Sequence, residues 1–371
     1  MKSIFLMVIL FFLSVSSSFS QIAPLTAEPD GNNKKASISE QIGIVKISVS
    51  YSRPGVKGRE GKIWNTPIAH YGFTDLGHGT SHAAPWRAGA NENTTISFSH
   101  PVHIEGKDLA AGIYGFFISL GEQESTLIFS KTSNSWGSFY YDSTEDALRI
   151  KVKNEILDKS VEWLRYEFTD QTGKSAVIAL SWEKRRIPFR VEADIQKLQM
   201  ASFRDEFRTT RPFYDFIQAA NYCINNNIEL EQALAWMDRA IYFRIMGVKN
   251  FQTLSTKAAV LTKMNRPEEA KKVMEEAIPM GTMTEVHFYA RALLNQLMLQ
   301  DALHVFKMNY DKFPNVFTTN VGLGRAYSAL GEYRKALQYI KAALPQSPDE
   351  MNRTHIEIMI KNLEEGKDVN Q

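Results

Sequence analysis

Apolar and polar residues alternate along the first half of the chain, from Ser37 to about Glu192. The segment 45–51, VKISVSY, is apolar at every second position, and similar runs recur as far as Val191, separated mostly by turn residues. Alternation with period two is typical of half-buried strands, and many short strands without helices between them favour an antiparallel sandwich or barrel. We predict an antiparallel β-sandwich over residues 37–192.

The pattern changes to a helical period near Ala193. Ile195, Leu198 and Phe203 recur at helical spacing, which predicts an amphipathic connecting helix within residues 193–210. The residue before a proline avoids the helical region, so the pair at 211–212, Arg-Pro, ends this helix. We predict that a helical repeat domain follows, over residues 211–371.

Four alanines recur in this second half. Ala233, Ala270, Ala302 and Ala336 lie 37, 32 and 34 residues apart (270−233, 302−270, 336−302). A period of about 34 residues is that of the tetratricopeptide repeat, in which each unit is a pair of helices. The pattern therefore indicates a helical solenoid.

The last repeat carries this resemblance most clearly. It has a leucine–glycine pair, a tyrosine, a turn glycine and later small residues at the places of the family signature: Leu323, Gly324, Tyr327, Gly331, Ala336, Ala343 and Pro348. Three earlier copies are degenerate but in register, and residues 350–363 suit an end helix. The resemblance implies a solenoid that binds a protein or peptide, whereas an unrelated helical bundle is the alternative.

Polar side chains on the first helix of each pair are candidates to contact that partner. In such repeats the first helices supply most of the inner face. The candidates are Asn221, Asn225, Thr256, Lys257, Arg291, Asn295, Asn320 and Arg325. Amide and basic groups suit a peptide backbone, but the alternatives are that these residues are merely solvated, or that the repeats serve only as a dimerisation or docking arm.

The first twenty residues predict export. Lys2 is followed by the apolar run 4–13 and then by small residues at 18 and 20, the two positions that a signal peptidase reads, which is the pattern of a secretory signal peptide cleaved before Gln21. A transmembrane anchor is the alternative, but the run is shorter than the roughly 20 apolar residues that span a bilayer. We predict a periplasmic or secreted protein without a transmembrane segment, and a flexible leader over residues 21–36.

Composition changes this picture little. A formal net charge of +2, with 23% charged residues, gives no reason to expect a nucleic-acid or membrane-surface partner. Cys223 is the only cysteine, so the exported chain would have no internal disulfide. We interpret Cys223 as a buried structural thiol rather than a nucleophile.

The densest polar motifs lie between Ser52 and Thr94. The motifs, with two that follow them, are SRP at 52–54, KGR at 57–59, IW at 63–64, YG at 71–72, WRAGANENT at 86–94, GKDLAAGIY at 106–114 and WG at 136–137. In this order they resemble an exported bacterial domain catalogued as domain of unknown function 2911, over about residues 37–192. The resemblance implies no activity, and this chain departs from the family pattern by an insertion at 73–85.

Eight residues of these motifs are candidates to bind a small molecule: Arg53, Lys57, Arg59, Trp64, Trp86, Arg87, Asn91 and Glu92. Guanidinium groups bind carboxylates bidentately, and tryptophan faces stack on rings or cations, so the set suits a sugar or an anionic small molecule. The alternative is structural, with an internal ion pair between Arg87 and Glu92 and tryptophans that plug the ends of the sandwich.

Histidines cluster in and beside the insertion. His78 and His82, with Asp75 nearby, form a weak candidate for a divalent-metal site, because imidazole and carboxylate groups are common metal ligands. Gly77 and Gly79 oppose the helix that would bring both histidines to one face, so a mobile polar loop is the alternative. Apart from this metal we predict no cofactor.

These patterns together predict an exported, non-catalytic binding or scaffold protein whose repeat domain contacts a protein or peptide. The alternative is an envelope enzyme, a carbohydrate-acting or metal-dependent hydrolase with its site in the sandwich. Glu92 with Asp142 or Asp146 could supply the carboxylate pair of a glycoside hydrolase. The sequence has no nucleophile elbow, phosphate-binding loop or dinucleotide fingerprint.

Overall fold

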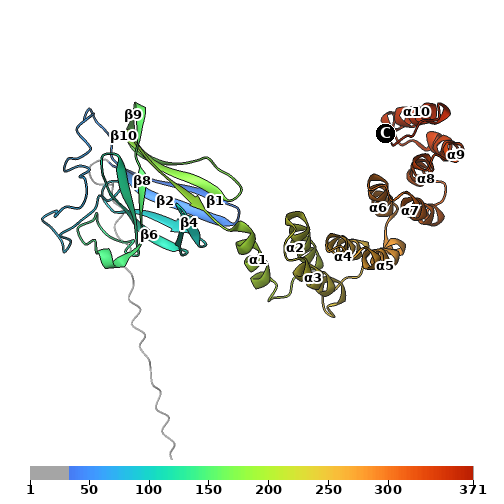
Figure 1. Cartoon of the computed structure of the whole chain (residues 1–371), viewed down its shortest axis with the longest axis horizontal. Coiled ribbons are helices and arrows are strands. Elements are labelled where there is room, and N and C mark those ends of the chain that lie inside the picture. The colour runs from blue at the N-terminus through green and yellow to red at the C-terminus, as the bar shows by residue number, and fades with distance from the viewer. Residues whose placement is uncertain (1–32, 371) are drawn as a thin grey trace, which may run out of the picture. The chain divides into compact units, whose positions relative to one another are not determined.

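The computed structural model describes residues 33–370, which form two units that divide between Ser202 and Phe203 (Figure 1). The N-terminal unit is built mainly of strands and the C-terminal unit of helices. The predicted signal peptide (1–20) and residues 21–32 of the predicted leader lie outside the described residues. Within residues 33–370, no helix has the length and apolar character needed to cross a membrane.

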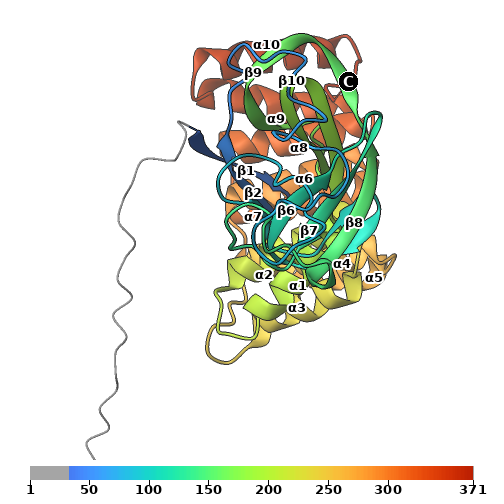
Figure 2. The ribbon, with the colours of Figure 1, turned by 90° about the vertical axis from the view of Figure 1, so that its left-hand side faces the viewer.

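Two antiparallel sheets make up the N-terminal unit, with strand orders β1-β2-β3-β6-β7-β8 and β5-β4-β10-β9. The strands of the first sheet are β1 (Lys34–Ile42), β2 (Val45–Arg53), β3 (Thr94–Phe98), β6 (Gly112–Ser119), β7 (Glu124–Ser130) and β8 (Asp146–Lys153). Those of the second are β4 (Val102–Ile104), β5 (Lys107–Leu109), β9 (Glu155–Thr169) and β10 (Ser175–Glu192). Figure 2 shows β6, β7 and β8 side by side.

One hydrophobic core lies between the two sheets. The ring centroid of Phe116, on β6, is 5.2 Å from that of Phe129 on β7 and 5.7 Å from that of Phe189 on β10. All three side chains are almost completely buried. Residues from both sheets thus share one interior, and the predicted antiparallel β-sandwich is confirmed.

The first strand begins earlier than the sequence predicted. β1 starts at Lys34 and pairs with β2 in one continuous register from Lys34 opposite Arg53 to Ile42 opposite Val45. The last three residues of the predicted flexible leader therefore belong to the sheet. Their apolar signal is weak because β1 is an edge strand, exposed or half-buried until it reaches Ile42.

A bulge interrupts β10 near its middle. The pairing register with β9 shifts between Ser181 and Glu183 and again between Glu183 and Arg185. Glu183 has a φ of 51°, in the left-handed region that residues with a side chain rarely adopt. Glu183 is buried, as is every residue of β10 from Ser175 to it, so the bulge lies in the interior of the unit.

Helix α1 (Ile195–Glu206) contains the division between the units, and nine further helices follow among the described residues. They are α2 (Phe213–Asn226), α3 (Leu230–Tyr242), α4 (Phe251–Lys263), α5 (Pro267–Ala277), α6 (Met283–Asn295), α7 (Leu299–Lys312), α8 (Phe317–Ala329), α9 (Tyr333–Ala343) and α10 (Glu350–Glu364). Consecutive helices from α2 to α9 pack against one another in four pairs, α2–α3, α4–α5, α6–α7 and α8–α9. The last helix, α10, packs on α9. The C-terminal unit is thus the predicted helical solenoid.

The four repeating alanines, which we call the alanine ladder, lie on the second helix of each pair, and all are buried. They are Ala233, Ala270, Ala302 and Ala336. At the last repeat Gly324 of α8 faces this ladder. A Cβ atom at Gly324 would lie only 2.4 Å from Cδ1 of Ile340 and 3.4 Å from the carbonyl oxygen of Ala336. The absence of a side chain therefore permits the close approach of α8 and α9.

Candidate functional site

Three tryptophans meet at one place in the sandwich. The Trp64 ring lies edge-on to Trp86 and Trp182, with centroids 5.8 Å and 5.7 Å away, and the Trp86 and Trp182 rings are stacked at 6.2 Å. Trp64 and Trp86 belong to the motifs that carry the family resemblance. These motifs, far apart in the sequence, thus come together around β10.

Arg185 completes this cluster, and the sequence analysis missed it. Its guanidinium carbon lies 4.6 Å from the ring centroid of Trp64 and 5.3 Å from that of Tyr71. Nη2 donates to the hydroxyl of Tyr71 at 2.6 Å and Nη1 donates to the carbonyl of Gly121 at 2.9 Å. Only 6% of Arg185 is exposed, and its buried Nε has no hydrogen-bond partner within residues 33–370.

Glu183 is the acidic member of the cluster. Its carboxylate accepts hydrogen bonds from Nε1 of Trp64 at 3.0 Å and from the backbone N–H of Gly61 at 3.3 Å. The indole N–H of Trp182 is buried and finds no acceptor in the described part of the chain. The charged run 183–186 inside an otherwise apolar strand is the sequence signal that could have revealed this site.

Arg87 and Glu92 do not form the ion pair that was one alternative. Arg87 donates from Nη1 to the backbone carbonyl of Asn91 at 3.0 Å, and its guanidinium lies 5.3 Å from the ring centroid of Phe139. Glu92 pairs with Nζ of Lys35 at 2.5 Å and accepts from the Ser52 hydroxyl at 3.2 Å. Each group thus has its own partners in the fold.

The ionisation of these two side chains follows from their surroundings. Burial lowers the pKa of Arg87. Partial burial acts to raise the pKa of Glu92, but the hydrogen bonds and the charge of Lys35 outweigh it, so the net shift is downward. These contacts favour the ionised form of Glu92, whereas the general acid of a glycoside hydrolase has a raised pKa.

The other basic candidates of the sandwich form no ion pair with any residue from 33 to 370. Arg53 donates from Nε to the carbonyl of Leu164 at 2.8 Å. Arg59 donates to the carbonyls of Val56 and Gly55 at 2.9 Å and 2.7 Å. Lys57 is exposed. Arg53 and Arg59 therefore hold loops in place, and a role for the three in ligand binding stays a prediction.

The two carboxylates weighed as partners for Glu92 are also engaged. Asp142 accepts from the backbone N–H of Thr144 at 2.9 Å and caps a short 3-10 helix. Asp146 accepts from the Tyr141 hydroxyl at 2.7 Å and from Nε of Arg149 at 2.5 Å. Both carboxylates thus stabilise one surface loop.

The insertion at 73–85 is largely exposed but makes specific contacts with residues 139–141. The backbone N–H of Ser81 donates to the carbonyl of Phe139 at 2.9 Å, and the ring of Phe73 stacks on Tyr141 with centroids 6.4 Å apart. His82 contacts Asp75 at 2.8 Å, whereas His78 lies edge-on to Phe139. Residues 33–370 hold no group of three potential metal-ligating His, Cys, Asp or Glu side chains, and a metal at His78 and His82 stays a prediction.

The partner candidates on the helices differ in exposure, and two of the eight, Asn320 and Thr256, are buried. Asn221, Asn225 and Asn295 are exposed. Asn320 is buried, and its Nδ2 donates to Oδ1 of Asn315 at 3.1 Å and to Oε1 of Gln346 at 3.0 Å. The prediction that Asn320 lines an open face is wrong, because its amide ties α8 to the turn after α9.

Thr256 also turns away from a partner. It is 8% exposed, and its hydroxyl donates to the carbonyl of Gln252 one turn earlier at 2.8 Å. This bond is satisfied within α4 itself. Thr256 is therefore part of the helix interior.

Arg291 and Arg325 occupy equivalent positions in successive first helices. Each lies nine residues after the N-cap of its helix, since 291−282 = 9 and 325−316 = 9. Asn221 has the same place on α2 (221−212 = 9), whereas Lys257 is only seven residues after its N-cap (257−250 = 7). Arg291, Arg325 and Asn221 thus mark one face, which we call the first-helix face.

Positive charge accumulates on this face. Burial, and then the charge of Arg291, lower the pKa of Arg325 to about 10. Burial first, and then the charges of Arg291 and Arg325, lower the pKa of His287 on α6 to about 4. Burial and the same two charges also lower the pKa of His355 on α10. Arg291 makes no hydrogen bond or ion pair with any residue that the structure describes. The first-helix face therefore carries a cation without a counter-charge.

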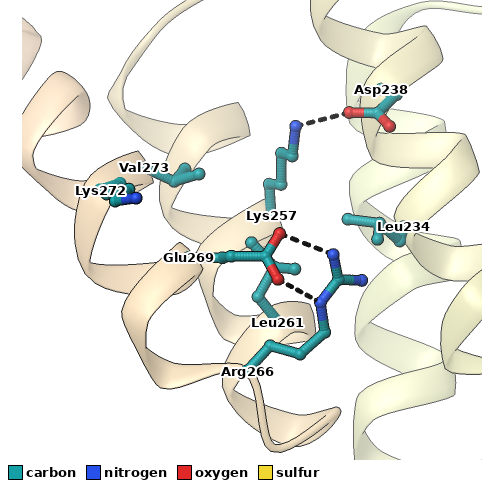
Figure 3. Close-up of a pocket in the computed structure, with 8 residues that line it drawn as sticks. All are labelled: Leu234, Asp238, Lys257, Leu261, Arg266, Glu269, Lys272 and Val273. Atoms are coloured by element: carbon teal, nitrogen blue, oxygen red, sulfur yellow. Dashed lines mark hydrogen bonds and ion pairs between the residues drawn. The ribbon is translucent and has the colours of Figure 1, made fainter.

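A pocket of about 380 Å³ lies between α3, α4 and α5 (Figure 3). It is lined by Leu234, Asp238, Lys257, Leu261, Arg266, Glu269, Lys272 and Val273. Lys257 pairs with Asp238 at 2.6 Å, and Arg266 pairs with Glu269 through two bonds of 2.6 Å. Its charges are largely neutralised by one another, in contrast to Arg291.

Comparisons with known proteins agree with the two-part architecture. Residues 33–191 match the family described as protein of unknown function (DUF2911), and residues 318–349 match the tetratricopeptide repeat. No similar protein was found among curated proteins.

Among solved structures, a double mutant of MamA RS-1 is 16% identical over 42% of this chain and 89% of its own, with a TM-score of 0.29. YrrB, described as a TPR protein with an unusual peptide-binding site, is 21% identical over 39% of this chain and 91% of its own, with a TM-score of 0.24. Likeness at this level does not say what this chain binds. The family matches do identify its parts: the chain carries a DUF2911 domain followed by a tetratricopeptide repeat.

Proposed function

We propose that this is an exported, non-catalytic scaffold protein that holds a partner protein on the first-helix face of its repeats. The observation that carries the proposal is Arg291, which is half-buried like Arg325 but has no counter-charge within residues 33–370. A charge in such a place is stabilised when a partner supplies a carboxylate or carbonyl. Export rests on the apolar run and small residues of the first twenty positions.

An apolar anchor stands beside this charge. Phe288 is 66% exposed and lies three residues before Arg291 on α6, hence on the same side of the helix. Buried aromatic anchors next to arginines are typical of the residues that dominate binding at protein interfaces. The pocket between α3, α4 and α5 is the poorer choice, because two of its three cations, Lys257 and Arg266, are paired with Asp238 and Glu269.

Site-specific photocrosslinking in cells that produce the protein tests this proposal. A photoreactive residue at Phe288 should give a discrete adduct with another protein, and Arg291→Glu should abolish that adduct. The matched control places the photoreactive residue at Gln338, exposed on the second helix α9. Equal adducts from Phe288 and Gln338, or none from either, would contradict the proposal.

For the sandwich we propose only a ligand class. The two buried donors without acceptors, Nε of Arg185 and Nε1 of Trp182, both belong to side chains that contact the Trp64 ring. Such donors favour an acceptor-rich molecule such as a sugar or a small anion. Isothermal titration with monosaccharides and dicarboxylates, on the intact chain and on Arg185→Met, would test it, and absence of heat with all of them would count against it.

A further inference from the structure

The chain folds back on the first-helix face after its last described helix. Gly366 has a φ of 72°, and the backbone N–H of Lys367 donates to the carbonyl of Asn362 at 2.8 Å, which turns the chain back at the end of α10. The next residues, 368–370, then lie against α8. We call residues 367–370 the return segment.

The return segment is bound to α8 as a peptide would be. The backbone N–H of Val369 donates to the Ser328 hydroxyl at 3.0 Å, and its carbonyl accepts from Nη1 of Arg325 at 3.3 Å. Asn370 donates from Nδ2 to the carbonyl of Arg325 at 2.9 Å, and Asp368 accepts from the Ser328 hydroxyl at 2.7 Å. Main-chain groups thus supply part of the binding, as they do in recognised peptides.

An apolar contact accompanies these bonds. Val369 is only 7% exposed and belongs to the hydrophobic core of the solenoid. Arg325 and Ser328 are three residues apart on α8, so both face the return segment. The polar groups of Arg325 and Ser328 are therefore bound by a segment of three consecutive residues. The first is acidic, the second is small and apolar, and the third carries an amide.

The neighbouring part of the same face holds no such segment. Arg291 has the place on α6 that Arg325 has on α8, yet it has no partner within residues 33–370, whereas Arg325 has the return segment. The contrast indicates that the return segment covers one portion of a longer binding face.

We propose that the return segment is an intramolecular occupant of the partner-binding face, and that the partner binds α8 as an extended peptide in competition with it. The partner's segment would carry an acidic residue followed by a small apolar one, in the places of Asp368 and Val369. This inference rests on the proposed function, since it adds regulation to the first-helix face.

A labelled peptide tests the competition directly. The probe is a fluorescein-labelled synthetic peptide with the sequence of residues 364–370, EEGKDVN, and the protein is the full chain or the full chain without residues 367–371. A short tether gives an effective concentration of about 1 mM, so a segment with a Kd of about 0.1 mM would weaken probe binding to the intact chain about tenfold. We expect the shortened chain to bind the probe at least that much more tightly by fluorescence anisotropy.

Two substitutions in the shortened chain locate the binding. Arg325→Ala should abolish probe binding, whereas Arg353→Ala, which removes an exposed cation of α10, should leave it unchanged. No binding by a shortened chain that retains its helical circular dichroism, or equal binding by intact and shortened chains, would overturn the proposal.

A second variant serves if the shortened chain does not fold. Asp368→Ala with Asn370→Ala in the full chain removes the side-chain contacts to Ser328 and Arg325 and keeps Val369. It should strengthen probe binding severalfold, and unchanged binding would overturn the proposal. The photocrosslinked adduct at Phe288 separates the two proposals. If it forms equally in the intact chain, in the shortened chain and in the chain with both substitutions, the proposed competition is contradicted while the proposed partner binding stands.

Discussion

His287 should make the solenoid lose stability as the pH falls. It is 8% exposed on α6, its buried Nδ1 has no hydrogen-bond partner in the described residues, and its ring centroid lies 5.4 Å from that of Phe306. Burial first, and then the charges of Arg291 and Arg325, lower its pKa from 6.5 to about 4. The neutral imidazole is therefore the form that the fold accepts.

The direction of the pH effect follows from this shift. Between pH 6.5 and about 4 the unfolded chain binds a proton that the folded chain does not, so the stability that the neutral ring provides is present above pH 6.5 and is lost as the pH falls toward 4. A shift of this size corresponds to about 3 kcal/mol in total, of which about 2 kcal/mol is lost between pH 7 and pH 5.

Two variants separate the contribution of His287 to the pH dependence of the unfolding free energy from that of an exposed histidine. Urea unfolding is followed by circular dichroism at pH 7 and pH 5 for the full chain, for His287→Gln and for His304→Gln, whose side chain is exposed on α7. His287→Gln should reduce the difference in unfolding free energy between the two pH values by about 2 kcal/mol, and His304→Gln should not. An unchanged pH difference in His287→Gln would refute the reasoning.

Three further changes are expected to have measurable effects. Gly324→Ala should lower the unfolding free energy by about 1–3 kcal/mol through overpacking against Ile340, and Ile340→Val in the same chain should restore part of it in thermal melts. Arg185→Met should lower the unfolding free energy by about 2–4 kcal/mol, because the Tyr71 hydroxyl loses its donor. Urea unfolding monitored by tryptophan fluorescence measures it, and a loss of less than about 0.5 kcal/mol would contradict this. Burial raises the pKa of Cys223 to about 11, so a thiol reagent at pH 8 should label it only when the chain unfolds, and rapid labelling of the native protein would show the reverse.

The sequence was most informative where one period extended over many residues. The alanine ladder and the strand alternation predicted the order of the two units, because both patterns record which side of an element is buried. It was least informative for single polar residues. Asn320 shares its residue type with the exposed Asn295, and only the turn after α9 decides that its amide is buried.

The same limitation applies to the sandwich. Trp64 and Trp86 were singled out by their motifs, but Arg185 lies about a hundred residues later on β10, and only the folded sheet brings it to the Trp64 ring. The partner of Glu92 could not be anticipated either, because Lys35 lies in a stretch that reads as a leader and folds as an edge strand.

The bulge in β10 limits which residues can stand at position 183. A left-handed backbone there disfavours most residues with a Cβ by roughly 1–2 kcal/mol, whereas glycine, and to a lesser degree asparagine, adopt it more readily. Glycine has no acceptor for the Trp64 indole and the Gly61 amide, and asparagine has one acceptor oxygen on a shorter side chain, whereas Glu183 offers a separate oxygen to each donor. Local backbone preference and side-chain chemistry thus demand different residues at one position. A glutamate there accepts a strained backbone and places two acceptor oxygens inside the sandwich.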